Sequence, residues 1–321
     1  APSSSAQGGA FFPERSSNRL EQFFRMAEIQ SVLFLYMLIG WICRKTDLVK
    51  AAAQPSFTNF LLYVSIPCMV FQSFDMEFTM ETLYRGASVL TIATISALVS
   101  LVFGRYAYNW CNPREKCIMK YGTLVSNSGF AGLPVIQDAY GQDGLFLGSL
   151  FIIPNRIMMW SAGISLFTDA PLKQRIKNVM LNPGIIAVEL GVLRMLFQPA
   201  IPQQLNKALS ALGAMSTPLG MVIIGMILSG VSPRTVLDKK AFILVAVRQF
   251  LFPLGTLAIL RLLGTDLLTL QISVVLTGMP VGSSTAFLAD KYGADAVFAS
   301  KCVFISTLTS LITIPILTIF F

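Results

Sequence analysis

The chain has 321 residues, of which 54% are hydrophobic and only 12% are charged, and its formal net charge is +8. Soluble domains carry about 25% charged residues, so most of this surface must face lipid rather than water. The absence of histidine excludes Ser-His and Cys-His catalysis and every His-ligated metal site. We therefore expect no enzyme, cofactor or metal. Because the basic residues lie in short loops between apolar runs, we expect a lipid bilayer rather than nucleic acid as the partner.

Residues 1–25 are polar and rich in Ser and Gly, and we expect them to form an N-terminal tail. Met26 leaves open whether tag residues precede a natural start. The rest of the chain contains ten apolar segments separated by short loops, which predicts an all-α integral membrane protein with ten transmembrane helices. The segments run approximately over 29–43, 57–74, 84–104, 117–140, 145–168, 182–198, 207–230, 241–263, 267–289 and 294–320.

The loops differ in their basic residues. The even-numbered loops and both tails together contain 6 Lys and Arg, whereas the odd-numbered loops contain 14. An excess of Lys and Arg marks cytoplasmic loops, so we expect the odd loops in the cytoplasm and both termini outside a cell membrane. The 14 residues are Arg44, Lys45, Lys50, Arg105, Arg114, Lys116, Lys120, Lys173, Arg175, Lys177, Arg234, Lys239, Lys240 and Lys291.

Two short patterns recur at nearly the same distance along the chain. Ser65-Ile-Pro67 corresponds to Ser216-Thr-Pro218, an offset of 218 − 67 = 151, and Tyr140-Gly141 corresponds to Tyr292-Gly293, an offset of 292 − 140 = 152. Chance recurrence is the alternative. Each half has five crossings, an odd number, so the second half must enter the membrane from the opposite side. The sequence therefore predicts two inverted five-helix repeats, over 26–168 and 169–321.

The fourth and ninth segments are interrupted near their middles. Unpaired backbone groups are tolerated at membrane depth only where protein or a water-filled cavity covers them, so two matched breaks indicate a transport site rather than two kinks. If the broken helices 4 and 9 cross, the free amides of their half-helix N-termini attract an anion. The interrupting residues are Asn127, Ser128, Gly129, Gly132 and Pro134 in the fourth segment, and Pro280, Gly282, Ser283 and Ser284 in the ninth.

Two of the cations within apolar segments are candidates for the site, because charge there is costly and usually functional. Arg156 follows Asn155 in the fifth segment, and either binds a substrate carboxylate at the crossing or pairs with a buried carboxylate such as Glu189. Lys301 lies in the tenth segment, and either neutralises the crossing or extends back to the cytoplasmic surface.

Other intramembrane charges favour structural roles. Glu189 and Arg194 in the sixth segment are expected to pair with each other. Arg248 and Gln249 in the eighth segment are also expected to have a structural role. No pair of carboxylates lies near the expected crossing, so the site is neutral to positive and favours an anionic substrate.

These motifs resemble a known family. Asn127-x-x-x-x-Gly132-x-Pro134 followed by Tyr140-Gly141 is similar to the fourth-helix crossover of the auxin efflux carriers. Pro280-x-Gly282-x-x-x-x-Phe287-x-Ala289-x-x-Tyr292 is similar to their ninth-helix crossover, and Asn182-Pro183 fits the start of their sixth helix. The length of the chain resembles that of bacterial members of this family, which belongs to the bile/arsenite/riboflavin transporter superfamily.

The resemblance implies a sodium/proton-antiporter-like fold. Helices one, two, six and seven would form a scaffold, through which two copies would form a homodimer, and the other helices would move as an elevator-type transport domain. Family members carry organic anions, including auxin and dicarboxylates such as malate or malonate.

We therefore expect a secondary transporter of small organic anions, with a carboxylate as substrate and alternating access at the crossing. One alternative is a proton- or sodium-coupled exchanger that uses Lys301, and another is a membrane sensor that binds the ligand without moving it. The expected substrate-binding residues are Asn127, Ser128, Gly129, Gly132, Pro134, Asn155, Arg156, Pro280, Gly282, Ser283, Ser284 and Lys301.

Overall fold

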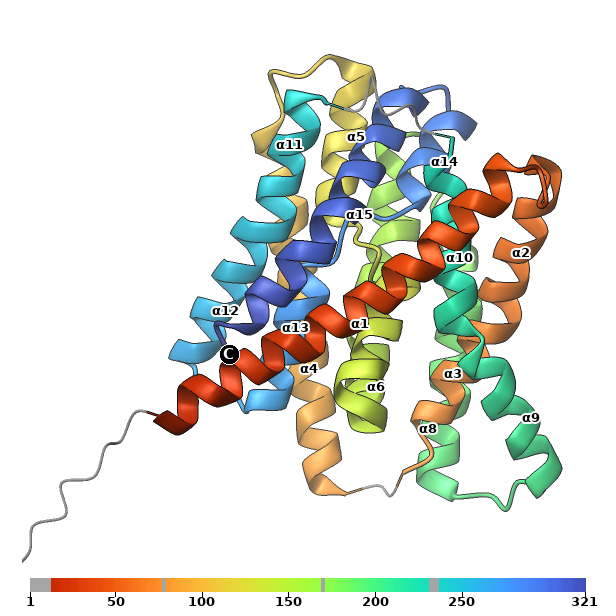
Figure 1. Cartoon of the computed structure of the whole chain (residues 1–321), viewed down its shortest axis with the longest axis vertical. Coiled ribbons are helices and arrows are strands. Elements are labelled where there is room, and N and C mark those ends of the chain that lie inside the picture. The colour runs from red at the N-terminus through yellow and green to blue at the C-terminus, as the bar shows by residue number, and fades with distance from the viewer. Residues whose placement is uncertain (1–12, 77–78, 169–170, 231–236) are drawn as a thin grey trace, which may run out of the picture.

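The computed structural model describes residues 13–76, 79–168, 171–230 and 237–321. In these ranges all regular elements are helical, and the only β-type pairing is one isolated bridge. In chain order (Figure 1), the α-helices are α1 (Pro13–Lys45), α2 (Gln54–Phe60), α3 (Ile66–Ser73), α4 (Met80–Ala107), α5 (Pro113–Leu124), α6 (Leu133–Met158), α7 (Leu172–Met180), α8 (Pro183–Phe197), α9 (Gln203–Ala214), α10 (Ser216–Leu228), α11 (Lys239–Ala246), α12 (Phe252–Leu262), α13 (Leu267–Thr277), α14 (Ser284–Lys291) and α15 (Ala296–Thr318).

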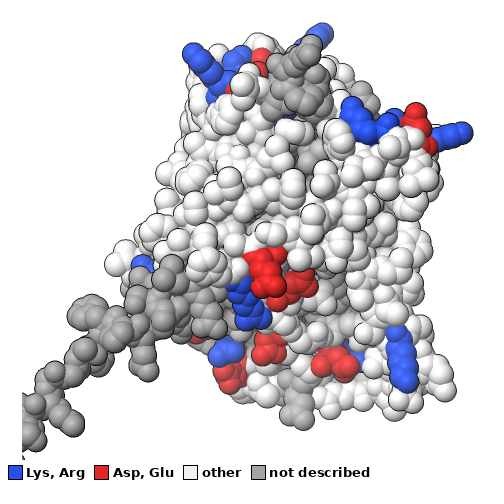
Figure 2. Space-filling view, in the orientation of Figure 1, with Lys and Arg blue, Asp and Glu red and all other residues white. Residues whose placement is uncertain are grey.

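Several of these elements are long and apolar enough to cross a bilayer, which confirms a helical, multi-pass membrane protein. On the face shown in Figure 2, charged side chains gather toward the two ends, with a broad uncharged band between them. Six candidate spans are found among the described residues: Phe23–Lys45, Met80–Ala107, Ser128–Leu166, Gln203–Leu228, Lys239–Leu262 and Ala296–Thr318.

The N-terminal helix begins earlier than the sequence suggested. α1 starts at Pro13, within the stretch expected to be a polar tail, and residues 1–12 of that expected tail lie outside the described residues. Pro favours the first position of a helix because its φ is preset and its missing amide is not needed there. Residues 14–28 contain neither Gly nor Pro, so nothing in the local sequence stops the helix before the apolar segment.

Three prolines are each preceded by a widened π-type turn. The turns are η2 (Leu61–Ser65), η3 (Ser128–Gly132) and η7 (Val247–Leu251), followed by Pro67, Pro134 and Pro253. Proline has no amide hydrogen, and its ring clashes with the carbonyl four residues earlier. That carbonyl belongs to the third residue of the turn in all three cases, so the wider turn removes the clash while the helix continues.

α1 lies across α10 and α15 (Figure 1). It meets α10 where two glycines oppose the partner backbone. A Cβ built on Gly40 would lie 2.0 Å from the carbonyl oxygen of Val222, and one on Gly225 would lie 1.9 Å from that of Met37. Small residues allow membrane helices to approach this closely, so these two positions determine how α1 and α10 cross.

The two expected breaks are confirmed. α5 ends at Leu124 before η3 begins, and α13 ends at Thr277 before α14 begins at Ser284. The first break lies slightly earlier than expected, at 125–127. Gly129, Gly132 and Pro134, which were expected to interrupt the helix, instead lie in the helical turns that follow the break.

The two Tyr-Gly patterns also match in geometry. Gly141 interrupts α6 with φ 65°, and Gly293 follows α14 with φ 69°. Both values lie in the left-handed region that favours glycine. The recurrence of Tyr140-Gly141 at Tyr292-Gly293 therefore places a glycine with positive φ at the same point of the pattern in both halves.

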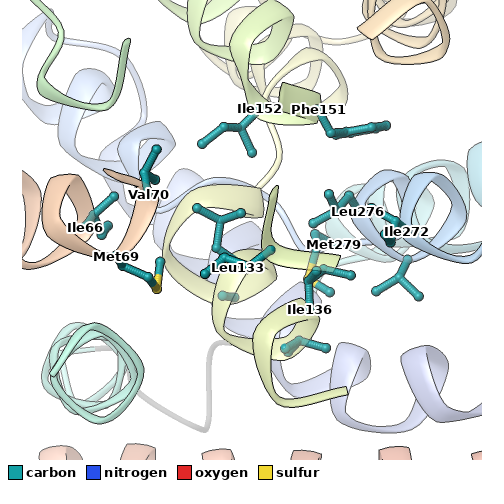
Figure 3. Close-up of a cluster of buried hydrophobic side chains, with 14 of the residues drawn as sticks. Ile66, Met69, Val70, Leu133, Ile136, Phe151, Ile152, Ile272, Leu276 and Met279 are labelled. Atoms are coloured by element: carbon teal, nitrogen blue, oxygen red, sulfur yellow. The ribbon is translucent and has the colours of Figure 1, made fainter. Parts of the chain in front are cut away.

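A buried apolar layer packs around the first turns of α6. In Figure 3, Leu133 and Ile136 lie at the centre of the cluster, with α3 on one side and α13 on the other. Burial of such side chains removes them from both water and lipid and keeps the crossing in place. The surrounding residues are Ile66, Met69, Val70, Phe151, Ile152, Ile272, Leu276 and Met279.

Candidate functional site

The two breaks lie against each other and exchange backbone hydrogen bonds. The amide of Asn127 donates to the carbonyl of Pro280 at 2.8 Å, and the amide of Gly282 donates to the carbonyl of Val125 at 3.1 Å. These bonds form an antiparallel bridge between Ser126 and Val281. The irregular backbone of each helix is therefore satisfied by the other, as required for unwound segments inside a membrane protein.

Each break is followed by the start of a new helical segment. The carbonyl of Asn127 accepts the amides of Ala131 at 2.9 Å and Gly132 at 3.1 Å, so η3 starts directly at the crossing. α14 starts at Ser284 on the other strand of the crossing. The first amides of a helix have no intrahelical partner, and the dipole gives this end a partial positive charge. Two such ends meet beside the bridge.

Polar side chains connect the two breaks. Asn127 Nδ2 donates to Ser283 Oγ at 3.3 Å. Asn155 Nδ2 donates to Ser126 Oγ and Ser128 Oγ, both at 2.9 Å. The structure thus brings together α6, the first break and the second break in one hydrogen-bonded group.

Tyr121 also contacts the second break, although no local sequence pattern indicated it. Its hydroxyl shares a 2.9 Å hydrogen bond with Ser284 Oγ, although the two residues are 163 positions apart. The Tyr121 side chain is fully buried. A tyrosine near the end of an apolar helix resembles any core aromatic residue until its partner is known.

Arg156 lies over the start of η3. A Cβ built on Gly129 would lie 2.2 Å from Arg156 Nη2, so only glycine accommodates the guanidinium in this position. In the described part of the chain, no ion pair or hydrogen bond engages this guanidinium, and the proposed partner Glu189 is exposed. The alternative of a structural pair with Glu189 is therefore wrong, and Arg156 lies at the crossing.

A cavity of about 910 Å³ opens beside the crossing. Lys301 lines it together with Arg156, and none of the described lining residues is Asp or Glu. Among the described lining residues, two cations and two helix N-termini face no carboxylate, which makes this part of the cavity electropositive.

Most of the expected binding residues line this cavity. Three do not, because they pack into the protein behind it: Gly132, which faces Leu276 and Met279, Pro134 and Pro280. The expected residues on the cavity wall are Asn127, Ser128, Gly129, Asn155, Arg156, Gly282, Ser283, Ser284 and Lys301.

The opposite wall comes from elements that the sequence did not assign to the site. Gln54, Thr58 and Asn59 of α2 and Asn182 before α8 contribute polar groups. The signal was visible, since polar residues begin an otherwise apolar segment, but α2 could not be assigned to the crossing without the fold. The apolar lining residues include Leu62, Ile66, Ile223, Ile224 and Ile227.

Arg194 serves a structural role with a different partner from the one expected. It pairs with Asp75 at 2.7 Å and donates to Gln72 Oε1 at 2.7 Å. The expected partner Glu189 lies five residues away on the same helix, which places it about 140° around the axis. The expected pair of Glu189 with Arg194 is therefore wrong, and Arg194 instead joins α8 to the end of α3.

Comparison with known proteins identifies the family of the chain. The model of the membrane transport protein family matches residues 28–179 and 170–318. An uncharacterized transporter of Methanothermobacter thermautotrophicus is 26% identical over 302 residues, which cover 90% of this chain and 95% of the relative. An uncharacterized transporter of Methanocaldococcus jannaschii is 21% identical, covering 90% and 96%.

A third relative, from Rhizobium meliloti, is named "Putative malonate transporter". It is 22% identical over 320 residues, which cover 90% of this chain and 94% of the relative. The family expected from the two crossover motifs is thus confirmed. The chain belongs to the membrane transport protein family, whose named relatives here are transporters and not enzymes.

Proposed function

We propose that the chain is a secondary transporter of small organic anions, with carboxylates as its substrates. The observation that carries this proposal is the position of Arg156, which lies over Gly129 at a crossing where two helix N-termini meet. A carboxylate bound there would accept hydrogen bonds from the guanidinium and from free backbone amides, the strongest donors that proteins offer to it.

Transport would use ten crossings arranged as two inverted repeats, with the crossing near mid-membrane. The positive φ values of Gly141 and Gly293 and the paired breaks support this arrangement. α3, α8, α9 and the α1–α10 pair would form a scaffold for a homodimer, and the elements of the crossing would move against it as an elevator.

The cavity would face the cytoplasm in this conformation. Its lining includes Gln54, Asn182, Gly230 and Val297, which adjoin the loops that carry the excess of Lys and Arg. Under the positive-inside rule these loops are cytoplasmic and both termini are outside. An anion that binds from the cytoplasm and leaves an inside-negative cell gains about 2.3 kcal/mol per charge per 100 mV, so export would need no coupled ion.

Binding and flux of defined carboxylates test the proposal. Malonate, malate and auxin should be screened by thermal shift of the purified protein, and any ligand found should then be measured for flux in proteoliposomes. We expect at least one carboxylate to raise Tm and to be transported. If none of them binds, the proposal is wrong, and binding without flux would instead identify a sensor.

Asn127→Ala tests the assigned site, because it removes the side-chain hydrogen bond to Ser283 but leaves the backbone hydrogen bond to Pro280. We expect folded protein with most ligand binding lost. Binding equal to that of the unmodified protein would contradict the assignment.

A coupled exchanger is the second candidate, and the position of Lys301 on the cavity wall favours it. Flux measured with and without a pH gradient, in unmodified protein and in Lys301→Gln, separates this function from passive carriage.

A further inference from the structure

Arg248 lies behind the crossing and contacts both broken helices. It belongs to η7 and is 4% exposed. Its Nη1 donates to the carbonyl of Thr123 at 2.9 Å, and its Nε donates to the carbonyl of Met279 at 3.4 Å. Thr123 is in the last turn of α5, and Met279 follows the end of α13. One guanidinium therefore bridges the carboxyl ends of the two half-helices.

The charges on the two sides of the crossing are opposite. Each helix C-terminus carries about half a negative elementary charge, so two adjacent ends carry about one negative charge that a single guanidinium balances. Arg248 is not among the described residues that line the cavity. Arg156 accompanies the N-terminal ends on the cavity side, and Arg248 accompanies the C-terminal ends away from it.

Gln249, the next residue of η7, connects η7 and the second break to α15. Gln249 Nε2 donates to the carbonyl of Ser306 at 2.5 Å. Ser306 Oγ in turn accepts the amide of Val281 at 3.1 Å. Arg248 and Gln249 are both buried, so η7 holds the second break from two directions.

Helix C-termini and unwound carbonyls of this kind are the groups with which ion-coupled secondary transporters hold Na⁺ or H⁺. We propose that Arg248 is a tethered counter-cation that occupies the position of a coupling ion, so that the chain binds no Na⁺ there. A guanidinium keeps its proton in proteins and cannot leave. The ends of the broken helices then remain neutralised throughout the transport cycle without any exchange of ions.

Removal of the tethered charge should create a requirement for a free cation. Purified Arg248→Ala protein should have a lower Tm than the unmodified protein in N-methylglucamine buffer. Na⁺, or a low millimolar concentration of ethylguanidinium, should restore most of that loss. Neither cation should change the Tm of the unmodified protein. If Na⁺ and ethylguanidinium raise the Tm of Arg248→Ala no more than they raise the Tm of the unmodified protein, the proposal is overturned.

Gln249→Ala is the matched control, because it removes a buried neutral donor from the same turn. We expect it to lose stability without any response to cations. A response as large as that of Arg248→Ala would mean that η7 is merely loosened, and would also overturn the proposal. If Arg248→Ala does not fold, Arg248→Met keeps most of the side-chain volume and should give the same cation response, whose absence would again refute the idea.

The idea of an ion-free cycle rests on the proposed transport function, but these Tm measurements need no substrate. Failure of every carboxylate to bind would refute the function and leave the role of Arg248 testable. Conversely, flux by the unmodified protein that requires a Na⁺ gradient would refute the role of Arg248 and leave the function intact.

Discussion

The guanidinium of Arg156 occupies the space that a side chain at residue 129 would need. The distance from a Cβ on Gly129 to Arg156 Nη2 would be only 2.2 Å. The two residues depend on each other: Gly129 leaves room for the guanidinium, and Arg156 supplies positive charge at the crossing. The first prediction follows from this contact.

Gly129→Ala should displace the guanidinium and weaken binding of the transported anion. Loss of a charge-assisted hydrogen bond costs about 1.5–3 kcal/mol, or roughly tenfold to a hundredfold in Kd. The control is Gly255→Ala in α12, where a Cβ meets nothing within 4 Å. Kd values from thermal shift or scintillation proximity check this, and equal Kd values for both variants would contradict the role of the contact.

Arg194→Ala should lower the free energy of unfolding by about 2 kcal/mol, because it removes a buried cation together with its ion pair to Asp75 and its hydrogen bonds to Gln72 and Asn206. The pairing of Arg194 with Asp75 rather than with Glu189 is tested by Glu189→Gln, which should change stability little because that side chain is exposed. The Tm of each variant, measured by thermal unfolding in detergent, compares their stabilities. A larger effect for Glu189→Gln would contradict the assigned pairing.

Gly225→Ala should disturb the crossing of α1 and α10. The new methyl group would lie 1.9 Å from the carbonyl oxygen of Met37, and overpacking of this kind costs about 1–3 kcal/mol. We expect a lower Tm and a smaller folded fraction on size exclusion. Gly255→Ala again serves as the comparison, and a Tm for Gly225→Ala as high as for that variant would count against the close contact.

Lys301→Cys, in a background without the five native cysteines, should react with a membrane-impermeant maleimide from the cytoplasmic side. The reason is that Lys301 lines the cavity beside loops with the excess of basic residues. Leu262→Cys should react only from the opposite side, because Leu262 is 88% exposed at the other end of the bundle. Labelling in right-side-out and inverted vesicles measures both, and the reverse pattern would overturn the proposed orientation.

Local properties of the chain were predicted well from the sequence. Hydropathy located the apolar segments, and Gly, Pro and Asn located the two breaks to within a few residues. These signals are readable because helix length and helix interruption depend on residues that are neighbours along the chain. The start of α1 was missed, since the polar residues after Pro13 form helix as readily as a tail.

The composition and order of residues thus determined a helical membrane protein with two interrupted segments and an excess of Lys and Arg in alternate loops. The tertiary structure alone decided which partner each buried cation has. Arg194 contacts Asp75, Arg156 lies over Gly129, and Arg248 bridges Thr123 and Met279. These partners are separated by between 27 and 125 positions, and such contacts depend on which helices pack together and at what depth, which no local pattern records.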